Sequence, residues 1–170
     1  LMSQEEHKLF AGVTPDTPGP VLGEIPHRPD GSVLGTLREW GAVDLVMNVM
    51  PARDEKVRLA ALDTAADYLL ARGVTWVQDA WVEPGDVDTY VAAADSLRMR
   101  FNLALYADPR HFDAQIRQFA ASRRRVDESA SPLLTANTVK FFADGVVENE
   151  TGALLEPYCS GLHNHGQINW

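Results

Sequence analysis

The sequence places one lysine, Lys140, inside the apolar run Thr-Val-Lys-Phe-Phe-Ala-Asp-Gly at residues 138–145. β-Branched and aromatic neighbours favour a buried strand here. A lysine ammonium in such a strand is costly unless it is paired, faces a cavity or loses its charge. The Asp-Gly pair ends the strand, and parallel α/β sheets carry their chemistry at the carboxyl ends of strands. Lys140 is therefore the first candidate for a functional residue.

Three chemical states of Lys140 are compatible with the sequence. In the first, its stem packs and its ammonium reaches solvent or pairs with a carboxylate such as Asp79 or Asp144. In the second, it is a desolvated base or a Schiff-base nucleophile. In the third, the amine has reacted with carbon dioxide to give a carbamate, an anion that can bridge two cations and removes the cost of a buried ammonium.

Other polar residues form weaker patterns. His163 and His165 have the spacing of a metal-binding pair on a strand, but they lie in a glycine-flanked stretch, so two solvated loop histidines are the alternative. Asp79 follows an apolar run and either helps to form a site or caps a turn. The loop after Lys140 contacts a substrate or is merely solvated; its polar residues are Glu148, Asn149, Glu150 and Thr151. His7, His27 and His111 are expected at the surface.

Composition excludes several classes of protein. The 170 residues are 45% hydrophobic and 23% charged, as expected of a globular chain with one core. A formal net charge of -9 argues against a nucleic-acid or membrane-surface partner. The sequence contains neither a Gly-x-Ser-x-Gly motif nor a phosphate-binding glycine loop. It therefore does not indicate a serine hydrolase or a nucleotide-binding site. Without a signal-peptide pattern or an apolar run of membrane-spanning length, we expect a cytoplasmic protein. The first residues do not resemble a natural start, so the chain is expected to be part of a longer one.

Periodicity predicts helices alternating with strands. Asp54 should cap the first long helix, with Val57, Ala61, Ala65 and Tyr68 on one apolar stripe and Leu69 beside it. The expected elements are a hairpin near residues 30–31, helices over 34–48, 54–72, from 85, and over 109–123, strands over 74–78, 100–106 and around Lys140, and a polar linker over 126–136.

This order predicts an α/β fold with about three parallel strands joined by right-handed crossovers. We expect an irregular segment with a short helix over residues 1–50. An α/β segment over 51–170 should follow, ending in a long loop after the Lys140 strand. Three strands do not close a barrel, so other elements, a partner chain or further residues are expected to complete the sheet.

Several segments together resemble amidohydrolase family 3, the metal-dependent hydrolases that include N-substituted formamide deformylase-like proteins. They are residues 17–39, 73–80 and 139–145, with Thr-Gly-Ala-Leu from Thr151 and the Pro-Tyr pair ending at Tyr158. The resemblance runs from about residue 10 to the end. It implies a partial (β/α)₈ barrel of the metal-dependent hydrolase type, with the three strands as the second to fourth. It also implies hydrolysis of amide-type C–N bonds by a water molecule that a divalent metal activates, and zinc is the metal expected first. Lys140 matches the lysine that is carboxylated and binds metal in many relatives.

The sequence also departs from the family pattern. The His-x-His of the first barrel strand is not found before residue 74, and the other ligands belong to later strands. We therefore expect a central segment that is inactive by itself and holds no metal alone. Its partners would be a small amide-type substrate and either further copies or the remainder of a longer chain. The candidate substrate-binding residues are Asp79, Trp81, Asp144, Glu150, Thr151 and Tyr158. The alternative is a non-catalytic structural or self-associating α/β module.

Overall fold

The computed structural model describes residues 12–160 and 163–170, so His7 lies outside the described residues. The chain forms two compact units, one of Leu1–Ala52 with Ala143–Trp170 and one of Arg53–Phe142. The expected boundary near residue 50 lies close to the first junction between the units. The loop after the Lys140 strand, however, groups with the N-terminal segment.

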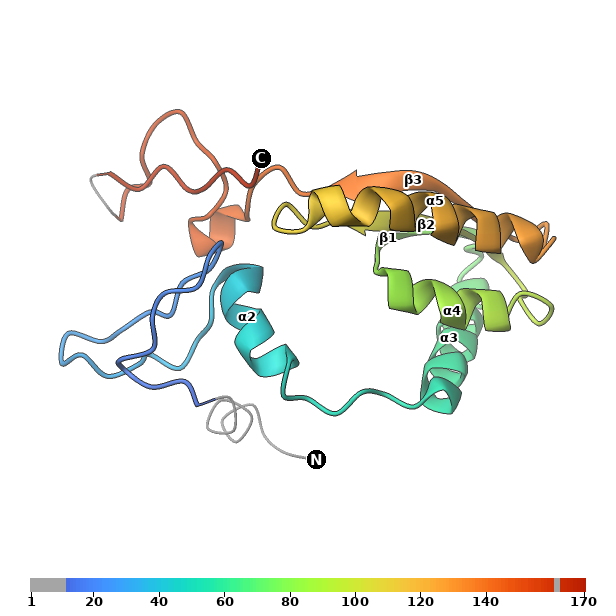
Figure 1. Ribbon diagram of the computed structural model, residues 1–170, viewed down its shortest axis with the longest axis horizontal. Coiled ribbons are helices and arrows are strands. Elements are labelled where there is room, and N and C mark those ends of the chain that lie inside the picture. The colour runs from blue at the N-terminus through green and yellow to red at the C-terminus, as the bar shows by residue number, and fades with distance from the viewer. Residues whose placement is uncertain (1–11, 161–162) are drawn as a thin grey trace. The chain divides into compact units, whose positions relative to one another are not determined.

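The unit Arg53–Phe142 is an α/β layer with a three-stranded parallel sheet, which confirms the predicted fold class (Figure 1). The strands lie in the order β1-β2-β3, so β2 is central. The unit contains α3 (Glu55–Leu70), β1 (Trp76–Val82), α4 (Pro84–Ala92), β2 (Arg100–Ala107), α5 (Phe112–Glu128) and β3 (Leu134–Phe141). Each strand is followed or preceded by a helix, as parallel strands require for their crossovers.

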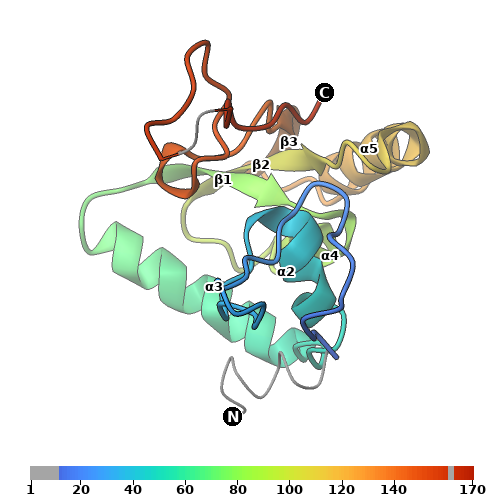
Figure 2. The same cartoon turned by 90° about the vertical axis from the view of Figure 1, so that its left-hand side faces the viewer.

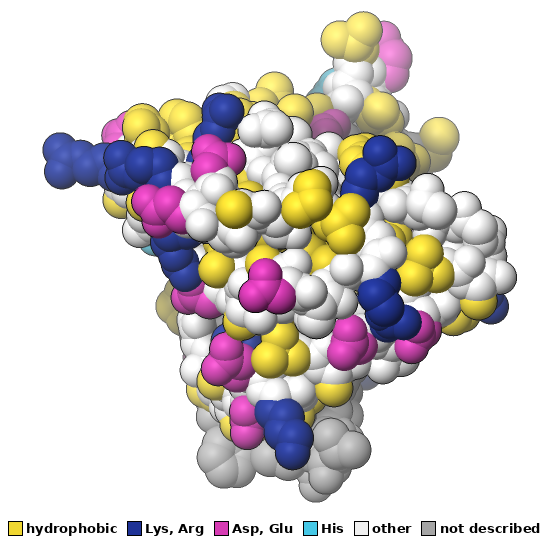
Figure 3. Space-filling view, turned by 90° about the vertical axis from the view of Figure 1, so that its right-hand side faces the viewer, with side chains coloured by type: hydrophobic (Ala, Val, Ile, Leu, Met, Phe, Trp, Pro, Cys, Tyr) yellow, Lys and Arg dark blue, Asp and Glu magenta, His cyan; other side chains and the backbone are white. Residues whose placement is uncertain are grey.

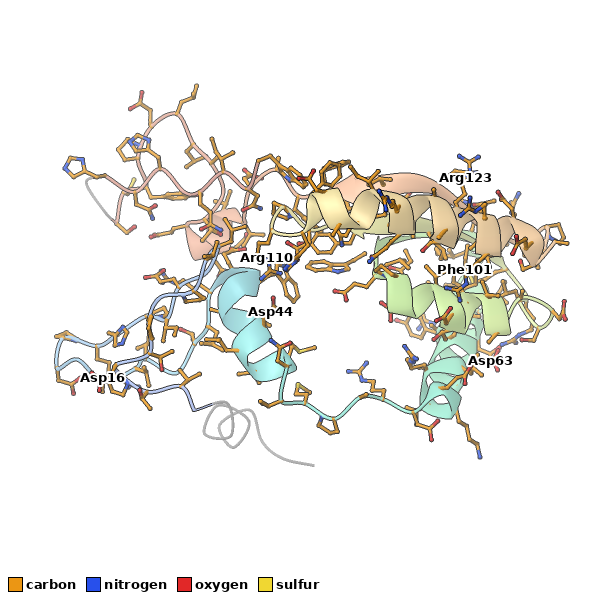
Figure 4. All side chains as sticks on the ribbon, in the orientation of Figure 1. Asp16, Asp44, Asp63, Phe101, Arg110 and Arg123 are labelled. Atoms are coloured by element: carbon orange, nitrogen blue, oxygen red, sulfur yellow. The ribbon has the colours of Figure 1, made fainter. Side chains whose placement is uncertain are left out.

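The three helices contribute to one core against a single face of this sheet (Figures 1 and 2). Leu103 of β2 is completely buried, together with Val87 of α4 and Val126 of α5. Phe101 lies on the same side of β2, where its ring centroid is 5.6 Å from that of Tyr90 (Figure 4). Alternate residues of a strand point to opposite faces, so this core fixes which side chains face the other way.

Helix α3 begins as predicted but buries a different stripe. The carboxylate of Asp54 accepts a hydrogen bond from the Lys56 backbone N–H at 2.9 Å. The predicted stripe is wrong, because Val57 is 57% exposed and Tyr68 is 59% exposed. Leucines with a larger apolar surface pack against the core instead, around buried Ala66; they are Leu62, Leu69 and Leu70. The ring of Tyr68 is covered by the guanidinium of Arg72, 3.4 Å from its centroid.

Helix α5 begins and ends later than predicted. It spans Phe112–Glu128 rather than residues 109–123. Asp108 is not its cap, because its carboxylate binds Arg110. The polar linker predicted over 126–136 is also wrong, since Val126 is buried in α5 and Leu134 is buried in β3. Both ends of that supposed linker therefore belong to the core.

Register shifts in both outer strands change their alternation. On β1, Asp79 pairs with Leu103 and Val82 pairs with Leu105. Three steps on β1 thus match two on β2, and the strand continues beyond its predicted end at residue 78. On β3, the partners of Asn102 and Ala104 are Thr135 and Thr138, so this strand also contains one extra residue.

The other unit is mostly irregular. It contains α2 (Glu39–Met47), which begins five residues later than predicted, and a 3₁₀ turn at Val147–Asn149. The predicted hairpin is confirmed by the antiparallel bridge between His27 and Val33, with Gly31 at a φ of 85° in the turn. The backbones of Glu24 and Arg38 also pair. Across the described residues, no helix combines the length and apolarity needed to cross a membrane.

Charged side chains of both signs are interspersed over the face drawn in Figure 3, with hydrophobic side chains between them. Several form ion pairs between helices or within one helix. Arg125 of α5 pairs with Asp88 of α4, and Arg123 lies 3.8 Å from Asp127. Exposed pairs of this kind contribute little to stability. The burial of apolar side chains is the larger contribution to holding the helices on the sheet.

The corrected core predicts contrasting effects of two substitutions. Leu103→Ala should lower the free energy of unfolding by about 2–5 kcal/mol, because it leaves a cavity at a fully buried position. Val57→Ala, in the stripe that the sequence wrongly places in the core, should change it by less than about 0.5 kcal/mol. Urea unfolding followed by circular dichroism measures both. Equal losses in the two variants would contradict the core described here.

Candidate functional site

The face of the sheet opposite the helices, here called the distal face, carries polar and aromatic side chains. Residues Phe101, Leu103 and Leu105 of β2 belong to the helix-side core. The alternate residues, including Asn102 and Tyr106, therefore lie on the distal face. Lys140 pairs with Tyr106 across the β2–β3 ladder and shares this face. The lysine thus lies at the carboxyl end of β3, away from the helices.

Three aromatic rings surround this end of the distal face. The ring centroid of Trp81 is 4.5 Å from that of Tyr106 and 4.9 Å from that of Phe142. The Nζ of Lys140 lies 4.6 Å from the centroid of the Phe142 ring. The structure therefore brings together two predicted site residues, Trp81 and Lys140, through Phe142. A cation beside an aromatic face gains about 0.5–2 kcal/mol.

Asp79 points to the other side of the sheet. The Tyr90 hydroxyl of α4 donates a hydrogen bond to its Oδ2 at 2.7 Å, and the Trp81 backbone N–H donates to its Oδ1 at 3.2 Å. Burial, and then the hydrogen bond to this carboxylate, raise the pKa of Tyr90. Asp79 joins β1 to α4, so it is not the carboxylate partner of Lys140. Among the ion pairs of the described residues, none involves Lys140.

A polar cluster that the sequence did not indicate follows β2. The Asp108 carboxylate accepts hydrogen bonds from Nε and Nη2 of Arg110 at 2.9 and 2.7 Å. His111 Nδ1 lies 3.3 Å from Asp108 Oδ2. The Oε1 of Gln115 accepts a hydrogen bond from the Asp108 backbone N–H. Burial alone would raise the pKa of Asp108, but the hydrogen bonds from Arg110 and His111 lower it to about 2. The sequence feature that could have indicated this cluster is the position of Asp108, an acidic residue close to the end of a predicted strand.

The other unit contains a polar cavity of about 270 Å³. It is lined by two of the predicted substrate-binding residues, Glu150 and Thr151. Glu24, Arg38 and Glu39 of the N-terminal segment line it as well. The Thr151 hydroxyl donates a hydrogen bond to Glu39, and Arg38 lies 3.1 Å from Glu24. Sequence reasoning missed the three N-terminal residues, since nothing in the sequence links residues 24–39 to residues 149–151.

Asp144 and Tyr158 support the loop that carries these residues. The Ala153 backbone N–H donates to Asp144 Oδ2 at 2.9 Å. The Tyr158 hydroxyl donates to the Gly152 carbonyl oxygen at 2.7 Å. Partial burial, followed by nearby carboxylates of which Glu150 is the first, raises the pKa of Tyr158. Neither residue lines the cavity.

The described residues do not fit a metal centre by themselves. Within residues 12–160 and 163–170, no three His, Cys, Asp or Glu side chains lie close enough together to hold an ion. His163 is exposed, and His165 Nδ1 lies 3.3 Å from the Leu154 carbonyl oxygen. Lys140 is therefore a single candidate ligand, and a catalytic zinc site needs three protein ligands.

Three parallel strands alternate with helices here, and a lysine lies at the carboxyl end of the third strand, which defines an α/β fold. Residues 7–169 match the amidohydrolase family, and the chain belongs to this family. Among solved structures it is similar to an uncharacterized metal-dependent hydrolase from Pyrococcus furiosus, with a TM-score of 0.60 and 16% identity. That similarity covers 96% of this chain and 31% of the other chain. No curated protein matches the chain.

The Asp108 cluster predicts a pH-dependent loss of stability. Its folded pKa of about 2 lies below the value of about 3.9 in an unfolded chain. The carboxylate therefore stabilises the fold above about pH 4, and this contribution is lost as the pH falls towards 2. At pH 7, Asp108→Asn should lower the free energy of unfolding by on the order of 2 kcal/mol, and the difference should close near pH 2.

Denaturant unfolding of the 170-residue chain between pH 2 and 7 measures this difference. The control is Asp95→Asn, at an exposed carboxylate in the turn after α4, which should stay within about 0.5 kcal/mol of the parent throughout. A difference between Asp108→Asn and the parent that stays constant over the whole range would contradict the assignment.

Proposed function

We propose that this chain is a segment of a metal-dependent amidohydrolase that cleaves amide-type C–N bonds, and that it is inactive by itself. The observation that supports this most is the position of Lys140 at the carboxyl end of β3 on the distal face. In α/β barrels, residues at this end of the strands carry out the chemistry. Membership of the amidohydrolase family supports the hydrolytic reaction class.

Lys140 is proposed to serve as a carbamate ligand when a divalent metal, zinc in the first place, is bound. A carbamate would present two oxygens, which suit such a metal, and the metal would supply the Lewis acid of the hydrolysis. Without the metal, the Nζ of Lys140 lies beside the Phe142 ring, 4.6 Å from its centroid.

The proposed substrate contacts fall into separate groups. Trp81 offers an aromatic surface beside Lys140 for an apolar part of a substrate. Glu150 and Thr151 offer polar groups in the cavity of the other unit. Asp144 and Tyr158 are proposed to act indirectly, by holding that loop. Asp79 is proposed to position Trp81, because its carboxylate accepts a hydrogen bond from the Trp81 backbone N–H. N-substituted formamides are the first substrates to test.

The test uses a longer protein of this family that contains the segment. Lys140→Ala should lower kcat/KM for an N-substituted formamide by at least about 100-fold, because even partners of metal ligands typically account for 10–100-fold. Metal content should fall with it. Lys56→Ala, at an exposed lysine on α3, is the matched control and should change neither. Full activity and full metal content in the Lys140→Ala variant would contradict the proposal.

A second candidate is a non-catalytic, self-associating module. The described sheet has three strands, so the outer edges of β1 and β3 pair with no further strand among the described residues. Ile116 of α5 and Val139 of β3 are exposed and line an apolar groove of about 330 Å³. Unpaired strand edges next to apolar side chains favour association of copies. Sedimentation of the purified chain as a monomer at high concentration would exclude this candidate.

A further inference from the structure

The extra residue in β3 decides which face of the sheet Lys140 occupies. Before the register shift, Leu134 pairs with Phe101, and both belong to the helix-side core. Lys140 is six residues after Leu134, so an unbroken alternation would point both side chains to the same face. That face is the one that carries the helices. Lys140 would then point into the layer between sheet and helices.

After the shift, the structure shows the opposite arrangement. Lys140 pairs with Tyr106 on the distal face. Its neighbour Phe141 points to the helices instead, since its ring centroid lies 5.5 Å from that of Phe112 on α5. The shift between Thr135 and Thr138 is therefore the local feature that turns Lys140 to the distal face. An extra residue in a strand commonly redirects side chains in this way.

Asn102 of β2 spans this register shift with its side chain. Its Oδ1 accepts hydrogen bonds from the Thr135 hydroxyl at 2.9 Å and from the Asn137 backbone N–H at 3.4 Å. Its Nδ2 donates to the Thr138 hydroxyl oxygen at 2.9 Å and to Gln78 Oε1 at 3.0 Å. Both acceptor sites and both donors of the amide are thus used. Three of the four bonds hold β3 before, within and after the shift.

We propose that Asn102 is a positioning residue, which fixes the register shift in β3 and thereby presents Lys140 on the distal face. Asn102 is only 8% exposed, and a buried amide whose partners are removed leaves polar groups unsatisfied at a cost. A hydrophobic side chain at position 102 offers no hydrogen bond to β3 at the register shift. The regular alternation of side chains along β3 then competes with the shifted arrangement. The functional meaning of this role rests on the proposed function of Lys140, whereas the geometric role does not.

The experiment observes Lys140 directly in the 170-residue chain. The sequence contains three lysines, Lys8, Lys56 and Lys140, so reductive ¹³C-methylation gives few NMR signals, and Lys140→Arg assigns the relevant one. In the parent, the methyl signal of Lys140 should be shifted by the ring current of Phe142, whose centroid is 4.6 Å from Nζ. Asn102→Leu should abolish this shift and move the signal to that of an exposed lysine.

Gln78→Leu is the matched control, because it removes one hydrogen bond of Asn102 on the β1 side and none on β3. It should leave the Lys140 signal unchanged. Thr138→Val removes only the bond after the register shift, and it should reduce the ring-current shift in part. This variant decides the matter if Asn102→Leu fails to fold, as judged by circular dichroism.

Two outcomes would overturn the proposal. One is an unchanged Lys140 signal in the folded Asn102→Leu variant, or in Thr138→Val when Asn102→Leu does not fold. The other is a loss of the shift in Gln78→Leu equal to that in Asn102→Leu, since the effect would then not come from the contacts with β3. The readout needs neither metal nor activity, so it can succeed or fail independently of the Lys140→Ala test of function.

Discussion

The parallel pairing of β2 with both of its neighbours is the constraint on which the candidate site depends. β2 is buried along almost its whole length, and its alternate side chains fix the helix side and the distal face. Each neighbouring strand contains one extra residue relative to β2. Because side-chain direction has a period of two, one extra residue reverses the face of every residue after it. The shift in β3 lies before Lys140, and the shift in β1 includes Trp81; both of these side chains lie beside the Phe142 ring.

Much of the fold could be predicted from the sequence because its signals are local. Asp54 caps a helix through its own side chain, and Gly31 turns a hairpin through its own backbone. The buried stripe of α3 could not be predicted in this way, since both candidate stripes are apolar and only the packed core selects the leucines. The sequence predicts a polar linker at Val126 and Leu134 for a similar reason, because their neighbours in sequence are polar while their contacts are distant.

The candidate site was predictable in part. Lys140 stood out as a charge in an apolar strand, and the polar loop after it indicated Glu150 and Thr151. The face that Lys140 occupies was not predictable, because counting residues along β3 gives the wrong face unless the register shift is known. Asp79 stood out as an acid near a strand end, yet Tyr90 holds it on the helix side. Glu39 lines a cavity with Thr151 although more than a hundred residues separate them in the chain.

We propose that this segment of the amidohydrolase family contributes one metal ligand, Lys140, and that its described residues do not complete a metal centre. Elemental analysis of the purified 170-residue chain, combined with native mass spectrometry under non-acidic conditions, tests it most directly. We expect far less than one metal ion per chain and the mass of the unmodified polypeptide. Near-stoichiometric metal, together with a mass increase corresponding to bound carbon dioxide, would contradict it, because the chain would then assemble a site that its described residues do not form.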